Sequence, residues 1–158
     1  MSQFSVRLVT AIFSIALLAS VAMAQDTATM QAFRDKVKAD KKLVIAANMD
    51  LTEEEGKKFW PIYEAYQKDL TAINQRLATA ITTYATAYNS KSLTDDQAKK
   101  LATDALLADE DEVKLRKTYG AKLVQVLPGK KAARYLQLEN KIRAALRYEL
   151  ASSIPLVE

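Results

Sequence analysis

Apolar side chains recur at helical spacing over most of the chain, and one run is more regular than the rest. Its inner positions alternate in steps of three and four residues: Tyr63, Tyr66, Leu70, Ile73, Leu77, Ala80 and Tyr84. This heptad pattern is typical of a helix that packs along its length against a second helix, as in a coiled coil. It predicts a helix from Thr52 to about Tyr88, which would be about 54 Å long at 1.5 Å per residue.

Three further segments show helical spacing, and no segment alternates apolar and polar residues as a strand would. The predicted helices cover about 29–47, 94–127 and the residues after Gly129 up to about 151. In the first of them, the apolar residues at helical spacing are Met30, Phe33, Val37 and Val44. In the last of them, Ile142 and Leu146 belong to the apolar face. The predicted fold class is therefore all-α: an elongated four-helix hairpin with long second and third helices.

Two loops and one proline divide this pattern. The polar run 89–92 separates the second helix from the third, and Pro128 with Gly129 separates the third from the fourth. Pro61 lies beyond the first turn of the second helix, where it lacks a donor and crowds the carbonyl of Lys57. We expect a kink or a break near Lys57 to Pro61.

Two similar phrases, "LTEEE" and "LTDDQ", begin the second and third helices. In each, a Thr is followed three residues later by Glu or Gln, which is the spacing of a capping box. The Thr hydroxyl accepts from the third helical amide, and the Glu or Gln side chain accepts from the Thr amide. A Leu precedes each Thr, at the position of a hydrophobic staple. The structural motif residues are Leu51, Thr52, Glu55, Leu93, Thr94 and Gln97.

The N-terminal residues have the features of a cleavable export signal. Arg7 ends a short polar region, an apolar stretch follows, and Ala22 to Ala24 provides an A-x-A end. The apolar stretch is short for a membrane span, so cleavage is favoured over an uncleaved anchor. We expect residues 1–24 to be a signal peptide and residues 25–158 to form a single exported all-helical domain.

The chain contains no His and no Cys, and this excludes several classes of function. Disulfides, Ser-His and Cys-His catalysis, and zinc hydrolysis are all ruled out, and a transition-metal site is disfavoured. We therefore predict no enzyme activity, no cofactor and no metal. The net charge of +4 is too small to indicate nucleic-acid binding. The acidic run 109–112 is interpreted as the solvated partner of nearby cations, through Glu110–Lys114 and Glu112–Arg116 pairs.

Four predicted helices, an export signal and two boxes of the LTxxQ kind together resemble the Spy/CpxP family of periplasmic proteins. "LTDDQ" matches the family motif, whereas "LTEEE" departs from it at Glu55. The resemblance covers most of the exported chain in layout. It implies a periplasmic location and an antiparallel, cradle-shaped homodimer. It also implies either an ATP-independent chaperone or a protein that holds an envelope-stress sensor inactive.

The leading functional hypothesis is a holdase that binds unfolded or envelope proteins. The alternative is a helical interaction module that regulates an inner-membrane sensor kinase through its periplasmic domain, without general client binding. For a holdase, basic residues beside apolar ones would attract and then retain a client. The candidate client-binding residues are Ile62, Lys68, Arg76, Ile81, Arg116, Lys122, Arg143 and Arg147. A set of solvated charges paired with neighbours such as Glu139 is the simpler interpretation of the basic ones.

Overall fold

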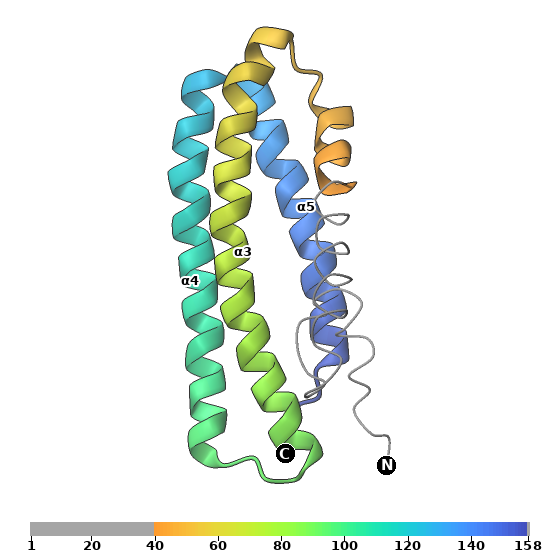
Figure 1. Cartoon of the computed structure of the whole chain (residues 1–158), viewed down its shortest axis with the longest axis vertical. Helices are drawn as coiled ribbons and strands as arrows, with labels where there is room; N and C mark the ends of the chain where they lie inside the picture. The colour runs from red at the N-terminus through yellow and green to blue at the C-terminus, as the bar shows by residue number, and fades with distance from the viewer. Residues whose placement is uncertain (1–39, 158) are drawn as a thin grey trace, which may run out of the picture.

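The computed structural model describes residues 40–157, and most of this part of the chain is helical (Figure 1). The helical segments are 40–49, α3 (Glu53–Asn89), α4 (Asp95–Val126) and α5 (Gly129–Ser153). Residues 40–157 contain no strand, so the predicted all-α class with long second and third helices is confirmed. Among these residues, no helix has the length and apolar character needed to cross a membrane. The predicted signal peptide and the start of the first predicted helix lie outside the described residues.

The long helices lie side by side and give the molecule an elongated shape (Figure 1). α3 has 37 residues and α4 has 32, and they run antiparallel as a hairpin. At 1.5 Å per residue α3 is about 55 Å long. The chain turns at Leu127 and Pro128, and α5 then runs back beside the hairpin in the direction of α3. Segment 40–49 lies beside the first half of α3 and runs antiparallel to it.

Pro61 lies inside α3, which continues through it as a single helix, so the proline does not split the helix. An interior proline removes one backbone hydrogen bond and costs about 3 kcal/mol. Aromatic packing next to it offsets this cost. Phe59 is fully buried and its ring centroid lies 4.9 Å from that of Trp60, which in turn lies 5.4 Å from that of Tyr63.

Both predicted capping boxes are formed. At the start of α3, the Glu55 amide donates to Thr52 Oγ1 at 3.3 Å, and the Thr52 amide donates to Glu55 Oε2 at 2.8 Å. At the start of α4, the Gln97 amide donates to Thr94 Oγ1 at 3.3 Å, and the Thr94 amide donates to Gln97 Oε1 at 2.9 Å. The repeated phrase therefore marks the start of each helix of the hairpin.

The main core lies at the end of the hairpin where α3 begins, α4 ends and α5 begins; we call it the aromatic end. Its buried members come from all four helical segments and the turn after α4: Ile45, Met49, Phe59, Tyr63, Leu123, Leu127, Ala132 and Tyr135. Tyr135 joins α5 to α3, because its ring centroid lies 5.1 Å from that of Phe59 and 6.1 Å from that of Tyr63, both at steep angles. Such edge-to-face pairs are favourable beyond the area they bury.

The heptad seam of α3 is buried at some positions and only half-covered at others. Tyr63, Tyr66, Ile73 and Tyr84 are buried, whereas Leu70, Leu77 and Ala80 keep intermediate exposure. Ile81, one of the candidate client-binding residues, is only 6% exposed. The buried face of α3 is therefore wider than the predicted seam at this point of the helix.

Candidate functional site

An apolar groove of about 510 Å³ lies between α3, α5 and segment 40–49, and we call it the α3–α5 groove. Its large apolar lining comes from α3 and α5: Leu70, Ile73, Leu77, Ile142, Leu146 and Leu150. Leu146 remains 41% exposed, and its apolar neighbours, except Ile73, are only half-buried. α5 packs on α3 through Tyr135 near its first turns, and the groove follows further along both helices. The chain thus leaves a row of apolar side chains partly uncovered.

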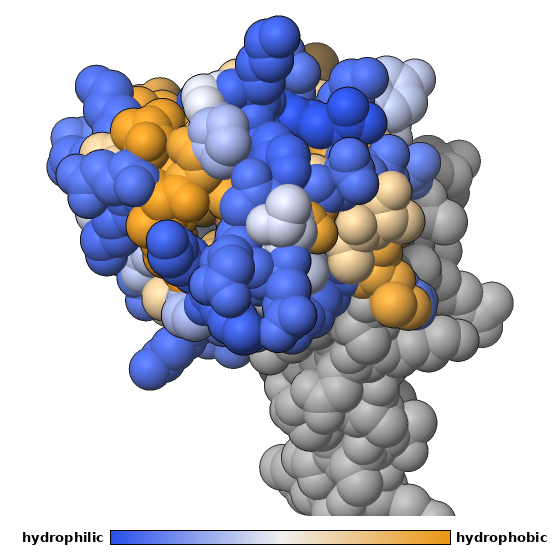
Figure 2. All heavy atoms as spheres, turned by 90° about the horizontal axis from the view of Figure 1, so that it is seen from above, coloured by the Kyte–Doolittle hydropathy of each residue, from blue (hydrophilic) through white to orange (hydrophobic). Residues whose placement is uncertain are grey.

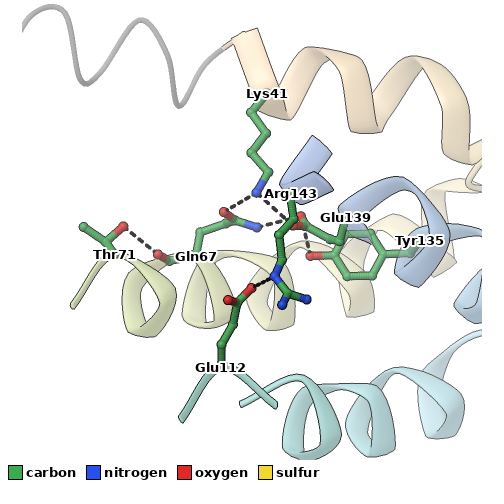
Figure 3. Close-up of polar contacts among 7 residues, drawn as sticks. All are labelled: Lys41, Gln67, Thr71, Glu112, Tyr135, Glu139 and Arg143. Carbon is green, nitrogen blue, oxygen red and sulfur yellow. Dashed lines mark hydrogen bonds and ion pairs between the residues drawn. The ribbon is translucent and has the colours of Figure 1, made fainter. Parts of the chain in front are cut away.

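A network of polar side chains closes one end of this groove (Figure 3). Lys41 Nζ donates to Gln67 Oε1 at 2.9 Å and to Glu139 Oε2 at 2.8 Å. Glu139 Oε1 also accepts from Gln67 Nε2 at 2.8 Å and from the Tyr135 hydroxyl at 3.1 Å. Glu139 is only 5% exposed, and a buried carboxylate is tolerated when a cation and further donors compensate it. This network holds segment 40–49, α3 and α5 together.

A second ionic cluster joins α4 to α5, and most of its side chains also line the groove. Glu112 is 5% exposed and forms ion pairs with Arg143 and Arg147, the latter at 2.9 Å. Arg147 also pairs with Asp109, and the hydrogen bond to that carboxylate raises the pKa of the guanidinium. The interpretation of Glu112 as a solvated partner of Arg116 is therefore wrong. Glu112 breaks the apolar pattern of α4 because two arginines of α5 meet it.

Within the acidic run, the predicted Glu110–Lys114 pair is formed, whereas Asp109 and Asp111 pair with arginines of α5 and α3. Glu110 pairs with Lys114 at 2.7 Å on the exposed face of α4. The hydrogen bond to Glu110 raises the pKa of the Lys114 ammonium. In the described residues, no group of His, Cys, Asp or Glu is arranged to hold a metal ion.

The buried tyrosines in the groove and beside it are neutral at ordinary pH. Burial, with the nearby Glu139 carboxylate as the second cause, raises the pKa values of Tyr63, Tyr66 and Tyr135 well above the usual value of 10. The carboxylates beside them are bound by cations. The site as described therefore offers apolar contact and fixed charges rather than a group poised for acid–base chemistry.

The structure does not gather the eight candidate client-binding residues into one surface. Arg143 and Arg147 share a face, as predicted, and line the α3–α5 groove, but they hold Glu112 rather than Glu139. Reversing both charges would place acids against Glu112, so it would disturb the fold as well as any client contact. Ile81 is interior and Ile62 is half-buried against the main core.

The remaining candidates are scattered over other faces. Arg76 pairs with Asp111 at 2.5 Å, and Lys122 lies over the ring of Tyr119, 4.4 Å from its centroid. Lys68 is exposed, and Arg116 lines a shallow hollow between α4 and α5. The predicted surface of mixed basic and apolar residues is therefore replaced by the groove.

Sequence reasoning assigned several groove residues to the interior instead. Leu70 and Leu77 were placed in the seam, and Ile142 and Leu146 on the inner face of the last helix. Their helical spacing is correct, but periodicity reports only the side of a helix on which a residue lies. It carries no signal for how completely a neighbouring helix covers that side.

A second apolar surface lies on the outside of α4. Leu106, Val113 and Val124 are 71%, 39% and 57% exposed, and their spacing of seven and eleven residues places them on one face. Seen from the aromatic end, the molecule is largely hydrophilic with separate apolar patches, the larger of them on the side of α4 (Figure 2). Residues 40–157 therefore include both a recessed and an open apolar surface.

Comparisons of the chain with models of protein families, with curated proteins and with solved structures gave no match. The recessed groove, the open stripe on α4 and the two capping boxes are therefore the features of the chain that bear on its function.

Proposed function

We propose that this chain is a periplasmic, ATP-independent holdase chaperone or envelope-stress protein that binds unfolded proteins in the α3–α5 groove. The observation that carries the proposal is a row of half-exposed apolar side chains along the groove, including Leu146 at 41% exposure. Exposed apolar surface of this kind marks interaction sites in stable proteins. The resemblance of the two boxes to the LTxxQ motif supports the same function.

The groove is suited to weak and reversible binding. From Ile142 to Leu150 it spans eight residues of α5, or about 12 Å at 1.5 Å per residue. An extended client would place about four residues along that length at roughly 3.3 Å each. Burying two or three apolar side chains contributes about 1.5–3 kcal/mol apiece, and ordering the client opposes this. Such a site releases its client without nucleotide hydrolysis.

Fixed charges around the groove would speed the encounter with a client without holding the client tightly. Lys42 and Glu64 pair at 2.5 Å at one wall, and both remain accessible to solvent. Arg147 is held by its carboxylate partners at another wall. Charges of both signs at the rim favour encounter with unfolded chains of mixed sequence, whereas apolar contact determines how long they stay.

We also propose that the chain forms a homodimer through the open stripe on α4. Leu106, Val113 and Val124 would become covered by a second copy. The dimer should have twice the mass of the chain in light scattering at micromolar concentration, and a monomeric mass would refute it.

The deciding experiment compares two matched charge insertions. Leu146→Glu places a carboxylate inside the groove, and Leu106→Glu places one on the outer stripe, where exposure is 71%. Suppression of aggregation is measured with two unrelated unfolded clients, and circular dichroism checks that helix content is unchanged. We expect Leu146→Glu to lower suppression at least tenfold and Leu106→Glu to leave it within about twofold, because a client bound in the groove would bury the new carboxylate at a cost of several kcal/mol.

The alternative regulatory module gives a different result in the same experiment. If the unmodified chain suppresses aggregation of neither client yet binds one sensor domain selectively, general chaperone function is excluded.

A further inference from the structure

The cationic residues of α5 fall into two groups of equal size. Those directed towards the hairpin each have a carboxylate partner: Lys131 pairs with Glu55, Arg143 with Glu112, and Arg147 with Asp109 and Glu112. The other group consists of Lys130, Arg134 and Lys141. Their side chains are exposed and form no ion pair with any residue from 40 to 157.

The unpaired cations lie on a single face of α5. Steps of four, three and four residues lead from Lys130 to Arg134, Gln137 and Lys141, and a step of seven leads on to Tyr148. Such steps keep residues on one side of a helix. All five are exposed, Tyr148 by 76%. We call these five residues the basic row, and its length along α5 is about 27 Å at 1.5 Å per residue.

No acidic side chain of α5 lies close enough along the helix to neutralise the basic row. Elsewhere in the molecule, exposed lysines pair with acids one turn away, as Lys99 does with Asp95 at 2.6 Å. Around each cation of the row, the positions three and four residues away hold no Asp or Glu. Lys130 and Arg134 are themselves one turn apart, and like charges at that spacing repel each other. The charge of the row is therefore not compensated by residues 40–157.

The form of the basic row fits a broad surface better than an enclosed ligand. None of its cations lines the α3–α5 groove or the hollow between α4 and α5. Tyr148 combines an apolar ring with a polar hydroxyl, and such side chains are suited to the headgroup level of a membrane. Lys and Arg side chains are attracted to anionic lipid headgroups at the same level. The row thus matches an anionic lipid surface in charge and in form.

We propose that the chain docks on an anionic phospholipid surface through the basic row of α5. Groove residues such as Ile142 and Leu146 lie on the opposite side of α5, so the docked chain keeps the α3–α5 groove away from the lipid. Each cation close to an anionic surface strengthens binding about fivefold, so the three together contribute about a hundredfold. The docking does not rest on the proposed function, because it needs no client.

Vesicle sedimentation tests the docking with the chain from Gln25 onward, without the predicted signal peptide. The vesicles contain either phosphatidylcholine with phosphatidylglycerol or phosphatidylcholine alone. A test variant neutralises the cations of the row, and a control variant removes the same charge from exposed, unpaired lysines elsewhere. The test variant is Lys130→Gln, Arg134→Gln, Lys141→Gln, and the control variant is Lys58→Gln, Lys68→Gln, Lys91→Gln.

At low ionic strength, we expect the unmodified chain to bind the vesicles that contain phosphatidylglycerol and not those of phosphatidylcholine alone. The test variant should bind about a hundredfold more weakly, and the control variant should lose no more than about fivefold. Equal losses in the two variants, equal binding to both kinds of vesicle, or no binding by the unmodified chain would overturn the docking.

Circular dichroism of each variant verifies that the fold is intact. A test variant that does not fold is replaced by Lys141→Gln alone, for which we expect about a fivefold loss of affinity. An unchanged affinity in Lys141→Gln would then overturn the docking.

Soluble competitors separate the lipid surface from other anionic partners. Inorganic phosphate should release no more chain from the vesicles than sodium chloride does at the same ionic strength. Specific release by phosphate would indicate an ion site, and tighter binding to soluble polyglutamate than to the vesicles would indicate an acidic protein partner. Either result would overturn the proposal.

A fluorescent label locates the contact, because the chain has no Cys of its own. Gln137→Cys places an environment-sensitive label within the basic row, and Gln125→Cys places the same label at an exposed position of α4. On vesicles that contain phosphatidylglycerol, we expect the emission to move to shorter wavelength at position 137 and to stay unchanged at position 125. Equal shifts at both positions, or a shift at position 125 alone, would overturn the assignment of the contact to α5.

Discussion

The two ends of the α3–α4 hairpin begin a helix with the same capping box but use it differently. At the aromatic end, Lys131 of α5 donates to Glu55 Oε2 at 2.6 Å and to the Asp50 carbonyl at 2.6 Å. At the other end, which we call the loop end, Gln97 is exposed and its side chain bonds to Thr94 within the same box. One box therefore joins three parts of the chain, and the other only starts a helix.

This difference gives Glu55 a role that a Gln at the same position could not have. Both Glu and Gln can accept the hydrogen bond from the capping Thr amide. Only the carboxylate can also pair with the Lys131 ammonium. Glu55 thus caps α3 and also joins it to α5 through Lys131.

Apolar side chains are also more deeply buried at the aromatic end than at the loop end. Phe59, Leu123 and Tyr135 at the aromatic end are between 0% and 1% exposed. Near the loop end, Leu93 and Leu101 are only half-buried. Most of the packing stability should therefore come from the aromatic end.

The largest predicted effect comes from truncating the aromatic core. Phe59→Ala should lower the free energy of unfolding by about 3–5 kcal/mol, because it leaves a cavity in a fully enclosed site. Leu101→Ala should cost about 1 kcal/mol, since that side chain is already half in water. Urea denaturation of both variants measures the contrast, and similar losses would show that the two ends are equally packed.

A smaller effect is expected from the two caps. Thr52→Ala and Thr94→Ala should each lower stability by roughly 1 kcal/mol, the usual loss for an N-cap. Thr52→Ala should cost the more of the two, because its box also positions the Glu55–Lys131 pair. The midpoints of urea unfolding give the comparison. An unchanged midpoint in Thr94→Ala, with client binding abolished, would mean that the motif has a direct functional role instead.

The smallest predicted effect is a pH dependence of stability that Glu55 gives to the first box. The hydrogen bond from Lys131, followed by that from the Thr52 amide, lowers the pKa of Glu55 below its ordinary value of 4.5. The folded state thus favours the carboxylate. The contribution of the Glu55 carboxylate to folding stability is fully present above pH 4.5, and it is lost as the pH falls through the lowered pKa.

Glu55→Gln keeps the cap but cannot pair with Lys131 or titrate. Its thermal midpoint should lie below that of the unmodified chain at neutral pH, and the gap should narrow once the pH falls below 4.5. Lys131→Met is the matched variant, because it removes the other partner of the Glu55–Lys131 ion pair. A gap that stays constant with pH would show that the Glu55 charge contributes nothing to stability.

Features of the fold that depend on local chemistry could be predicted from the sequence. A capping box is complete within four residues, so Thr52 and Thr94 mark the helix starts without knowledge of the rest of the chain. The heptad seam likewise identifies the inner side of α3. Pro61 was ambiguous because its effect depends on the packing of Phe59, which involves α5.

Features of the site that depend on distant contacts could not be predicted. Glu112 was assigned to solvent because its arginine partners lie 31 and 35 residues further along the chain. The half-exposure of Leu146 depends on how α5 lies against α3, which no local pattern encodes. The correct faces were therefore identified, but the groove between them was not.

The most direct test of the proposed function is to identify which residues of the chain a client contacts. Methyl NMR of a protein labelled at Ile, Leu and Val reports each apolar surface separately. Adding an unfolded client should shift the methyl signals of Leu146 and Leu150 in the groove and leave those of Leu106 and Val124 on the outer face of α4 unchanged. Shifts confined to Leu106 and Val124, with the groove signals unmoved, would contradict the assignment of client binding to the α3–α5 groove.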